Sequence, residues 1–225
     1  MKKSLFIVLI LITSFYFNVC AQVFKAQIIA GTNISQVDGD EVYGYKRWGG
    51  NAGLGVIFPI SKNKKWMIST ELLYSQKGSQ QSKTAVDTFE TGWKYRLFLD
   101  YLEVPVMIHL EDKETWTFGL GLSWARMINV KEYMNGDRVQ STTITNNPYK
   151  RDDFNILVDV RFRIWQQLKF NFRYAYSLVP IRENVVYQKV DKIRNQYNNL
   201  LTFRLIYIIN EKKEARKIKK VDNDE

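Results

Sequence analysis

Large apolar side chains and small or polar ones alternate along much of the chain with a period of two. In residues 168–178, aromatic rings occupy positions 170, 172, 174 and 176, and the positions between them carry lysine, asparagine, arginine and alanine. Successive side chains of a β-strand point to opposite sides, so this segment predicts a strand with two unlike faces. The same pattern recurs and predicts eight strands, over residues 24–35, 48–60, 65–77, 93–110, 115–131, 153–165, 168–179 and 199–209.

The predicted connections between these strands alternate in length. An up-and-down transmembrane barrel has short turns at the periplasmic side and longer loops outside. The pattern therefore predicts an all-β fold, an eight-stranded antiparallel up-and-down transmembrane β-barrel. The long connections are 36–47, 78–92, 132–152 and 180–198, and the short ones are 61–64, 111–114 and 166–167.

Alternation alone does not say which face points outward, because a soluble lipocalin-like exported barrel would enclose its apolar face around a small ligand. The size of the side chains favours the membrane. In residues 115–131, for example, tryptophan, phenylalanine and leucine alternate with glycine, serine and alanine. An eight-stranded barrel has room inside for modest side chains only, so we expect the large apolar face to contact lipid. Near Tyr101 and Leu102 the fourth strand breaks phase, which predicts a bulge or kink there.

The N-terminal residues have the layout of a cleavable signal peptide. Two lysines precede an apolar stretch over residues 5–17, and small residues follow. We expect cleavage before Gln22. A rival interpretation is a lipoprotein anchored through Cys20, the only cysteine, but the bulky Val19 before it fits a lipoprotein signal poorly.

Removal of residues 1–21 leaves a chain long enough for one barrel, over residues 22–210, followed by a charged periplasmic tail over 211–225. The full chain has a formal net charge of +10 and 14% aromatic residues. The aromatic excess suits the interfacial girdles of a barrel. Because the basic residues are scattered singly and the chain is exported, we expect no nucleic-acid partner.

Charged residues recur on the face that is predicted to point inward. Burial of an isolated charge is costly, so these side chains must pair with one another or keep water. We interpret them as a structural network that plugs a narrow lumen, and we expect no continuous pore. The residues are Glu71, Glu103, Asp159, Arg161, Arg163, Arg173 and Arg204.

We expect no catalytic site, no metal site and no cofactor. His109 is the only histidine and lies near the periplasmic end of its strand, so we expect a satisfied or solvent-facing imidazole. An outer-membrane enzyme acting on lipid or glycan is the alternative class, and the position of His109 argues against it. The carboxylates of residues 38–41 do not complete a calcium loop, and the glycines of 49–55 precede no helix, so we interpret them as a solvated turn and as lumen-facing glycines.

Aromatic and basic residues cluster in two of the predicted outer loops. Such clusters can bind glycan or anionic lipid headgroups, although near the rim of a barrel they more often belong to the interfacial girdle. The candidates for surface contact are Tyr43, Tyr45, Lys46, Arg47 and Trp48 in the first long loop and Tyr149, Lys150 and Arg151 in the third.

Five segments carry a resemblance to a known family: GTNISQVDGD at 31–40, ELLYSQKG at 71–78, DYLEVPV at 100–106, RYAYSL at 173–178 and NLLTF at 199–203. Together they resemble the PorT-like outer-membrane β-barrel family of Bacteroidetes. The resemblance implies a barrel of about eight strands in the outer membrane and brings no catalytic motif. The namesake of that family is tied to the machinery that exports proteins with C-terminal sorting domains.

These observations predict a non-enzymatic outer-membrane barrel with a structural, docking or surface-binding role. The expected partners are the outer membrane lipids and, as a candidate, an envelope protein complex that includes a protein-secretion assembly.

Overall fold

The computed structural model describes residues 24–40, 42, 44–61, 63, 65–81, 94–112, 115–187 and 192–209. The expected signal peptide and the charged tail lie outside the described residues. No helix in the described part of the chain is long and apolar enough to cross a membrane.

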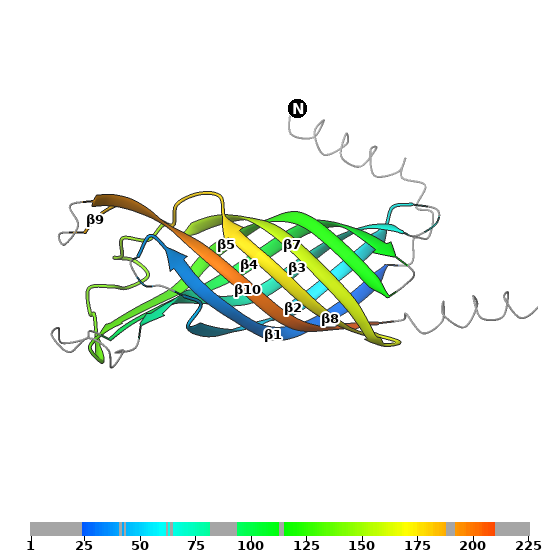
Figure 1. Ribbon diagram of the computed structural model, residues 1–225, viewed down its shortest axis with the longest axis horizontal. Coiled ribbons are helices and arrows are strands. Elements are labelled where there is room, and N and C mark those ends of the chain that lie inside the picture. The colour runs from blue at the N-terminus through cyan, green and yellow to red at the C-terminus, as the bar shows by residue number, and fades with distance from the viewer. Residues whose placement is uncertain are drawn as a thin grey trace, which may run out of the picture.

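The described residues form one antiparallel sheet that closes on itself as a barrel with tilted strands (Figure 1). The ring runs β1-β2-β3-β4-β5-β7-β8-β10, and β10 pairs with β1 to close it. This confirms the predicted eight-stranded up-and-down barrel, with β6 and β9 as short additions. The strands are β1 (Lys25–Asp38), β2 (Arg47–Pro59), β3 (Trp66–Gln81), β4 (Tyr95–Asp112), β5 (Trp116–Met134), β6 (Asp137–Arg138), β7 (Asp152–Trp165), β8 (Leu168–Ser177), β9 (Arg182–Tyr187) and β10 (Lys192–Ile208).

The large apolar face of the strands points outward, as the sizes of the side chains predict. On β8, Phe170 and Phe172 are 37% and 36% exposed, whereas Lys169, Asn171 and Arg173 are buried in the lumen. Burial alternates in the same way along the other strands of the ring. A belt of apolar side chains around a polar interior is the arrangement of a barrel that faces lipid.

Several strands are longer at the outer end than the sequence pattern predicts. β3 continues to Gln81 and β5 to Met134, and the predicted loop 180–198 contains a hairpin in which β9 pairs with the first part of β10. In Figure 1 this hairpin projects from the end of the barrel opposite the short β7–β8 turn. The strands extend because residues beyond the membrane still pack a second core, which is described below.

The predicted irregularity near Tyr101 and Leu102 is present, but the extra residue lies on the neighbouring strand. Asp100 pairs with Asn129 while Tyr101 pairs with Met127, so β5 carries one residue more than β4 at this level. On β4 itself the odd-numbered side chains stay buried without a change of phase. The sequence pattern changes there because the polarity of the surroundings changes.

Candidate functional site

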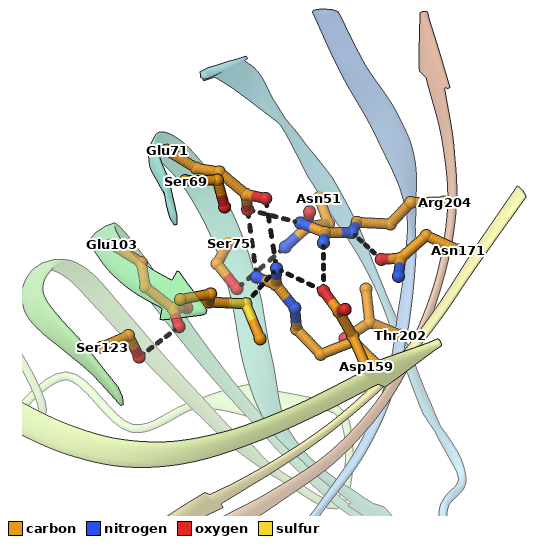
Figure 2. Close-up of polar contacts among 12 residues, drawn as sticks. Asn51, Ser69, Glu71, Ser75, Glu103, Ser123, Asp159, Asn171, Thr202 and Arg204 are labelled. Atoms are coloured by element: carbon orange, nitrogen blue, oxygen red, sulfur yellow. Dashed lines mark hydrogen bonds and ion pairs between the residues drawn. The ribbon is translucent and has the colours of Figure 1, made fainter. Parts of the chain in front are cut away.

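Glu71 lies on the inward face of β3 at the centre of the polar lumen. Its oxygens accept hydrogen bonds from Arg173 at 3.0 and 3.1 Å, from Arg204 at 2.9 Å and from Arg161 at 3.2 Å. The arginines come from β8, β10 and β7, so one carboxylate connects four strands. Figure 2 shows Glu71 together with Arg204 and Asp159 in the lumen. Charge-assisted hydrogen bonds of this kind are the stronger ones in proteins.

Asp159 on β7 completes the arrangement. It is the cross-strand partner of Arg173, whose guanidinium donates to it at 2.9 Å, and Arg161 and Arg204 approach it at 3.5 and 3.8 Å. We call Glu71, Asp159 and the three arginines the Glu71 cluster; none of the five is more than 3% exposed. Two carboxylates therefore neutralise most of the charge of three guanidiniums that are closed off from bulk water.

His109 on β4 packs against the Glu71 cluster, a contact that the sequence does not indicate. Its Nε2 lies 2.8 Å from Ser69 Oγ and 3.1 Å from Arg161 Nη2, and its Nδ1 lies 3.6 Å from Asp159. Because a guanidinium can only donate, Nε2 accepts from Arg161 and the ring is neutral. The imidazole is buried inside the barrel and does not face solvent, and its Nδ1 has no hydrogen-bond partner within the described residues.

Two glycines make room for these side chains. A Cβ on Gly119 would lie 2.3 Å from Asp159 Oδ1 and 2.5 Å from His109 Nδ1, and a Cβ on Gly55 would lie 3.0 Å or less from the side chains of Gln27 and Glu71. The structure thus places Gly55, within the glycine-rich segment 49–55, against a crowded lumen, where a larger residue would displace the charged groups.

A second ionic group lies closer to the outer end of the lumen. Lys77 Nζ is 3.0 Å from Asp153 and 3.6 Å from Glu103, and it lies over the ring of Tyr101. Asp153 also accepts hydrogen bonds from Ser177 and Asn198. We call Lys77, Asp153 and Glu103 the Lys77 cluster. Lys77 and Asp153 are absent from the predicted network. Each is an even number of residues from a predicted member on its own strand, Lys77 from Glu71 and Asp153 from Asp159, and therefore points to the same face.

The seven residues of the predicted network do not form a single contact cluster, because they lie at different depths. Glu103 belongs to the Lys77 cluster and accepts from Ser123 at 2.6 Å (Figure 2). Arg163 lies at the periplasmic end of β7, where it contacts Glu111 at 3.4 Å and donates to the carbonyl of Gln166.

The outer end of the lumen is apolar, which corrects the expectation of a small and polar interior along the whole barrel. Its buried residues come from the outer parts of β1, β4 and β5 and from the connections that hold Val42, Tyr149 and Ile181, and we call them the outer core. Buried polar side chains such as Ser79 and Gln196 also occur at this end, but the two ionic clusters lie deeper in the barrel. The outer core consists of Val37, Val42, Tyr95, Leu97, Leu99, Tyr101, Ala125, Met127, Val130, Tyr149 and Ile181.

Tyr149, predicted as a surface contact, is instead only 5% exposed within the outer core. Burial raises the pKa of its phenol to about 12, and Arg182 lies over its ring at 5.4 Å. The apolar body of the tyrosine fills the space between strands, which a loop position in the sequence does not reveal.

The other candidates for surface contact do not come together. Trp48 is 60% exposed on the outer wall, and Arg151 is exposed and donates to a loop carbonyl. Tyr45 donates to Asn199, and the buried Arg47 lies over the ring of Phe98 at 4.1 Å. Lys46 is exposed, Lys150 pairs with Glu183, and Tyr43 lies outside the described residues.

In the acidic turn 38–41, Asp38 and Asp40 use their carboxylates within the chain, and Glu41 lies outside the described residues. Asp38 accepts from Gln36 and Asn199, and the buried Asp40 accepts from the backbone N–H of Val42. Across the described ranges no group of three or more histidine, cysteine, aspartate or glutamate residues is placed to hold a metal ion.

Comparison with known proteins gives one family and several solved structures. Residues 20–183 match the family described as "Outer membrane protein beta-barrel domain". Neisserial surface protein A is 10% identical, with 82% of this chain and 96% of that chain covered and a TM-score of 0.45. Ail, the attachment invasion locus protein of Yersinia pestis, is 13% identical, with 82% of this chain and 98% of that chain covered and a TM-score of 0.47. The structure of Ail in complex with the heparin analogue sucrose octasulfate is 12% identical in sequence, with 83% of this chain and 99% of that chain covered and a TM-score of 0.46. No curated protein sequence matches the chain significantly.

Proposed function

We propose that this chain, which belongs to the family of outer membrane protein beta-barrel domains, is a closed, non-enzymatic barrel. It acts through its outer end. The observation that carries the proposal is the Glu71 cluster. Five charged side chains, none more than 3% exposed, cross the lumen between four strands. The outer core fills the lumen beyond them, so the interior serves to hold the barrel in one shape.

Conductance tests the closed lumen. The purified, folded protein in planar bilayers should give no steady ion current, whereas a porin reconstituted in the same way should conduct. Large and reproducible unitary steps from the folded protein would contradict the proposal.

The outer end offers a rigid surface for docking or ligand binding. The outer parts of β1, β4 and β5 and the loop around Tyr149 pack on the outer core, so this part of the outer end is held by buried apolar contacts. We take an envelope protein complex as the partner class, in a membrane whose lipids contact the apolar wall.

Site-specific photo-crosslinking in intact cells tests the docking surface. A crosslinking residue in place of the exposed Arg151 should capture a protein, and the same residue in place of Leu120, at the middle of the lipid-facing wall, should capture lipid only. Equal protein capture from both positions would count against docking at the outer end.

The resemblance of five segments to the PorT-like family of Bacteroidetes supports a narrower proposal, in which the docking partner is part of a protein-secretion assembly. Deletion of the gene should then reduce the export of proteins with C-terminal sorting domains. An unchanged set of exported proteins would remove the secretion role and leave the docking role standing.

Two further parts of the proposal are tested directly. N-terminal sequencing of the mature protein should begin at Gln22, the residue after the expected cleavage site.

The lipid A composition of cells that carry His109→Ala should equal that of wild-type cells, because the buried imidazole contacts only other lumen side chains. A changed lipid profile would favour the enzyme alternative.

A further inference from the structure

The apolar outer wall ends abruptly on β4. The outward-facing side chains from Leu110 to Leu102 are apolar, with Ile108 51% and Leu102 43% exposed. Residues 102–110 have the length of about 9–11 residues with which a tilted strand crosses the hydrocarbon layer. The next outward positions, Asp100, Phe98 and Arg96, therefore lie at the level of the outer lipid headgroups.

Basic and aromatic side chains share this level of the wall. Directly paired residues of an antiparallel sheet point to the same face, and Arg96 pairs with Tyr133, which in turn pairs with Arg138. Phe98 pairs with Lys131, and the rings of Phe98 and Tyr133 meet edge to face at 5.7 Å. We call Lys94, Arg96, Lys131 and Arg138, with these two rings, the outer basic patch.

The outer basic patch contains a hollow. A pocket of about 290 Å³ is lined by Lys94, Arg96, Phe98, Tyr133 and Gly136. The backbone of Lys94 is held by Asn135, which donates to its carbonyl at 2.7 Å and accepts from its N–H at 3.0 Å. The hollow is thus bounded by two cationic side chains and two aromatic rings on a fixed backbone.

The positive charge of the patch is not neutralised within the described residues. No carboxylate of this part of the chain lies within 4.0 Å of the charged nitrogens of Lys94, Arg96, Lys131 or Arg138, and Arg96 Nε is buried without a hydrogen-bond partner. Asp100 lies on the same face, but its oxygens accept from Gln76 and Asn129. A phosphate in the hollow would supply the counter-charge that the described carboxylates do not.

We propose that Arg96 and Lys94, beside the rings of Phe98 and Tyr133, bind the phosphate of a lipid headgroup in the outer leaflet. The guanidinium fork and the ammonium of these residues match phosphate oxygens, and aromatic rings lie favourably at the membrane–water interface. The depth of the patch selects a lipid over a soluble anion, because its lower edge is continuous with the wall that contacts the acyl chains. This site goes beyond the docking role, since it concerns the membrane around the barrel.

The test compares charge-matched variants of the full-length protein in detergent micelles. The patch variant is Lys94→Gln/Arg96→Gln, and the control is Lys65→Gln/Arg194→Gln, which removes one charge at the opposite end of the barrel and one elsewhere at the outer end. Native mass spectrometry measures the retention of diphosphorylated lipid A and of its dephosphorylated form. Heat-modifiable migration on a gel shows that each variant is folded.

The wild type and the control should retain the phosphorylated lipid preferentially, and the patch variant should bind it roughly tenfold more weakly, the loss expected for about one charge-assisted contact. Arg96→Lys keeps the charge but not the planar guanidinium, so its affinity for the phosphorylated lipid should lie between that of the wild type and that of the patch variant. It replaces the patch variant in the comparison if the double variant does not fold. Three results would overturn the proposal: equal retention of both lipids by the wild type, an equal loss in patch and control variants, or binding of inorganic phosphate that matches that of the lipid.

Discussion

The two parts of β4 differ in which face is polar. In the part surrounded by lipid, Glu103 and His109 point inward and leucine, isoleucine and valine point outward. In the outer part, Leu97 and Leu99 point inward and Arg96 points outward. The strand keeps one phase throughout, and only its surroundings change from lipid to water. The inversion of polarity therefore marks the outer boundary of the membrane. In the sequence this inversion looks like a break of phase, and it leads to the prediction of a bulge on this strand.

The two parts also depend on different interactions. The interior of the membrane-spanning part is held by paired charges, so removal of one partner leaves a buried charge without compensation. The outer core is held by close packing, so removal of atoms leaves a cavity. The following substitutions separate the two cases, beginning with the largest expected effect.

Glu71→Ala should cost the most, because it leaves Arg161, Arg173 and Arg204 together around Asp159 alone. We expect a loss of about 3–5 kcal/mol in the free energy of unfolding, measured by urea titration in lipid vesicles. Glu183→Ala, which removes a carboxylate from the exposed Lys150–Glu183 pair, is the control and should cost about 1 kcal/mol or less. Equal losses would mean that the Glu71 cluster is hydrated rather than closed.

Lys77→Met should cost about 3 kcal/mol, because Glu103 and Asp153 then face each other without the intervening ammonium. The double variant Lys77→Met/Asp153→Asn removes one charge of each sign and should recover part of the loss. The same unfolding assay gives the coupling from a double-mutant cycle. Additive losses would show that Lys77 and Asp153 do not act as a pair.

Leu99→Ala should cost about 2–3 kcal/mol, because its side chain is fully buried in the outer core. Leu102→Ala removes the same atoms from the lipid-facing wall and should cost less than about 1 kcal/mol. Susceptibility of the outer end to protease should rise in the first variant only. A larger effect at Leu102 would contradict the position of the membrane boundary.

Asp40 should make the outer end sensitive to pH. Burial raises the pKa of its carboxyl to about 6 from the ordinary 3.8, so the folded chain binds this proton more tightly than the unfolded chain. The stabilisation is present below pH 3.8 and is lost as the pH rises through about 6. The difference should be about 3 kcal/mol in the free energy of local opening, measured by hydrogen exchange.

Asp40→Asn should flatten this dependence between pH 4 and 7, whereas Asp38→Asn should leave it in place. If the pH dependence of exchange persists unchanged in Asp40→Asn, another group titrates at the outer end.

Much of the fold follows from local pattern, but the partners within the lumen do not. Parity along a strand assigns Glu71, Asp159 and Arg173 to the interior, and the same rule applied throughout would also have found Lys77 and Asp153. It does not separate Arg163 from the cluster, because depth along the axis depends on the register between strands. It also does not place Tyr149 in the outer core, because a loop has no periodicity from which burial can be inferred.

The sequence by itself determined the eight two-faced strands, their order of short and long connections, and the face that contacts lipid. These properties follow from backbone geometry and side-chain size, both of which are local. Only the tertiary structure decided which charges meet, where the interior turns apolar and which loop residues become buried. Glu71 reaches Arg173 and Arg204 across 102 and 133 residues of chain, and closure of the ring alone brings them within hydrogen-bond distance.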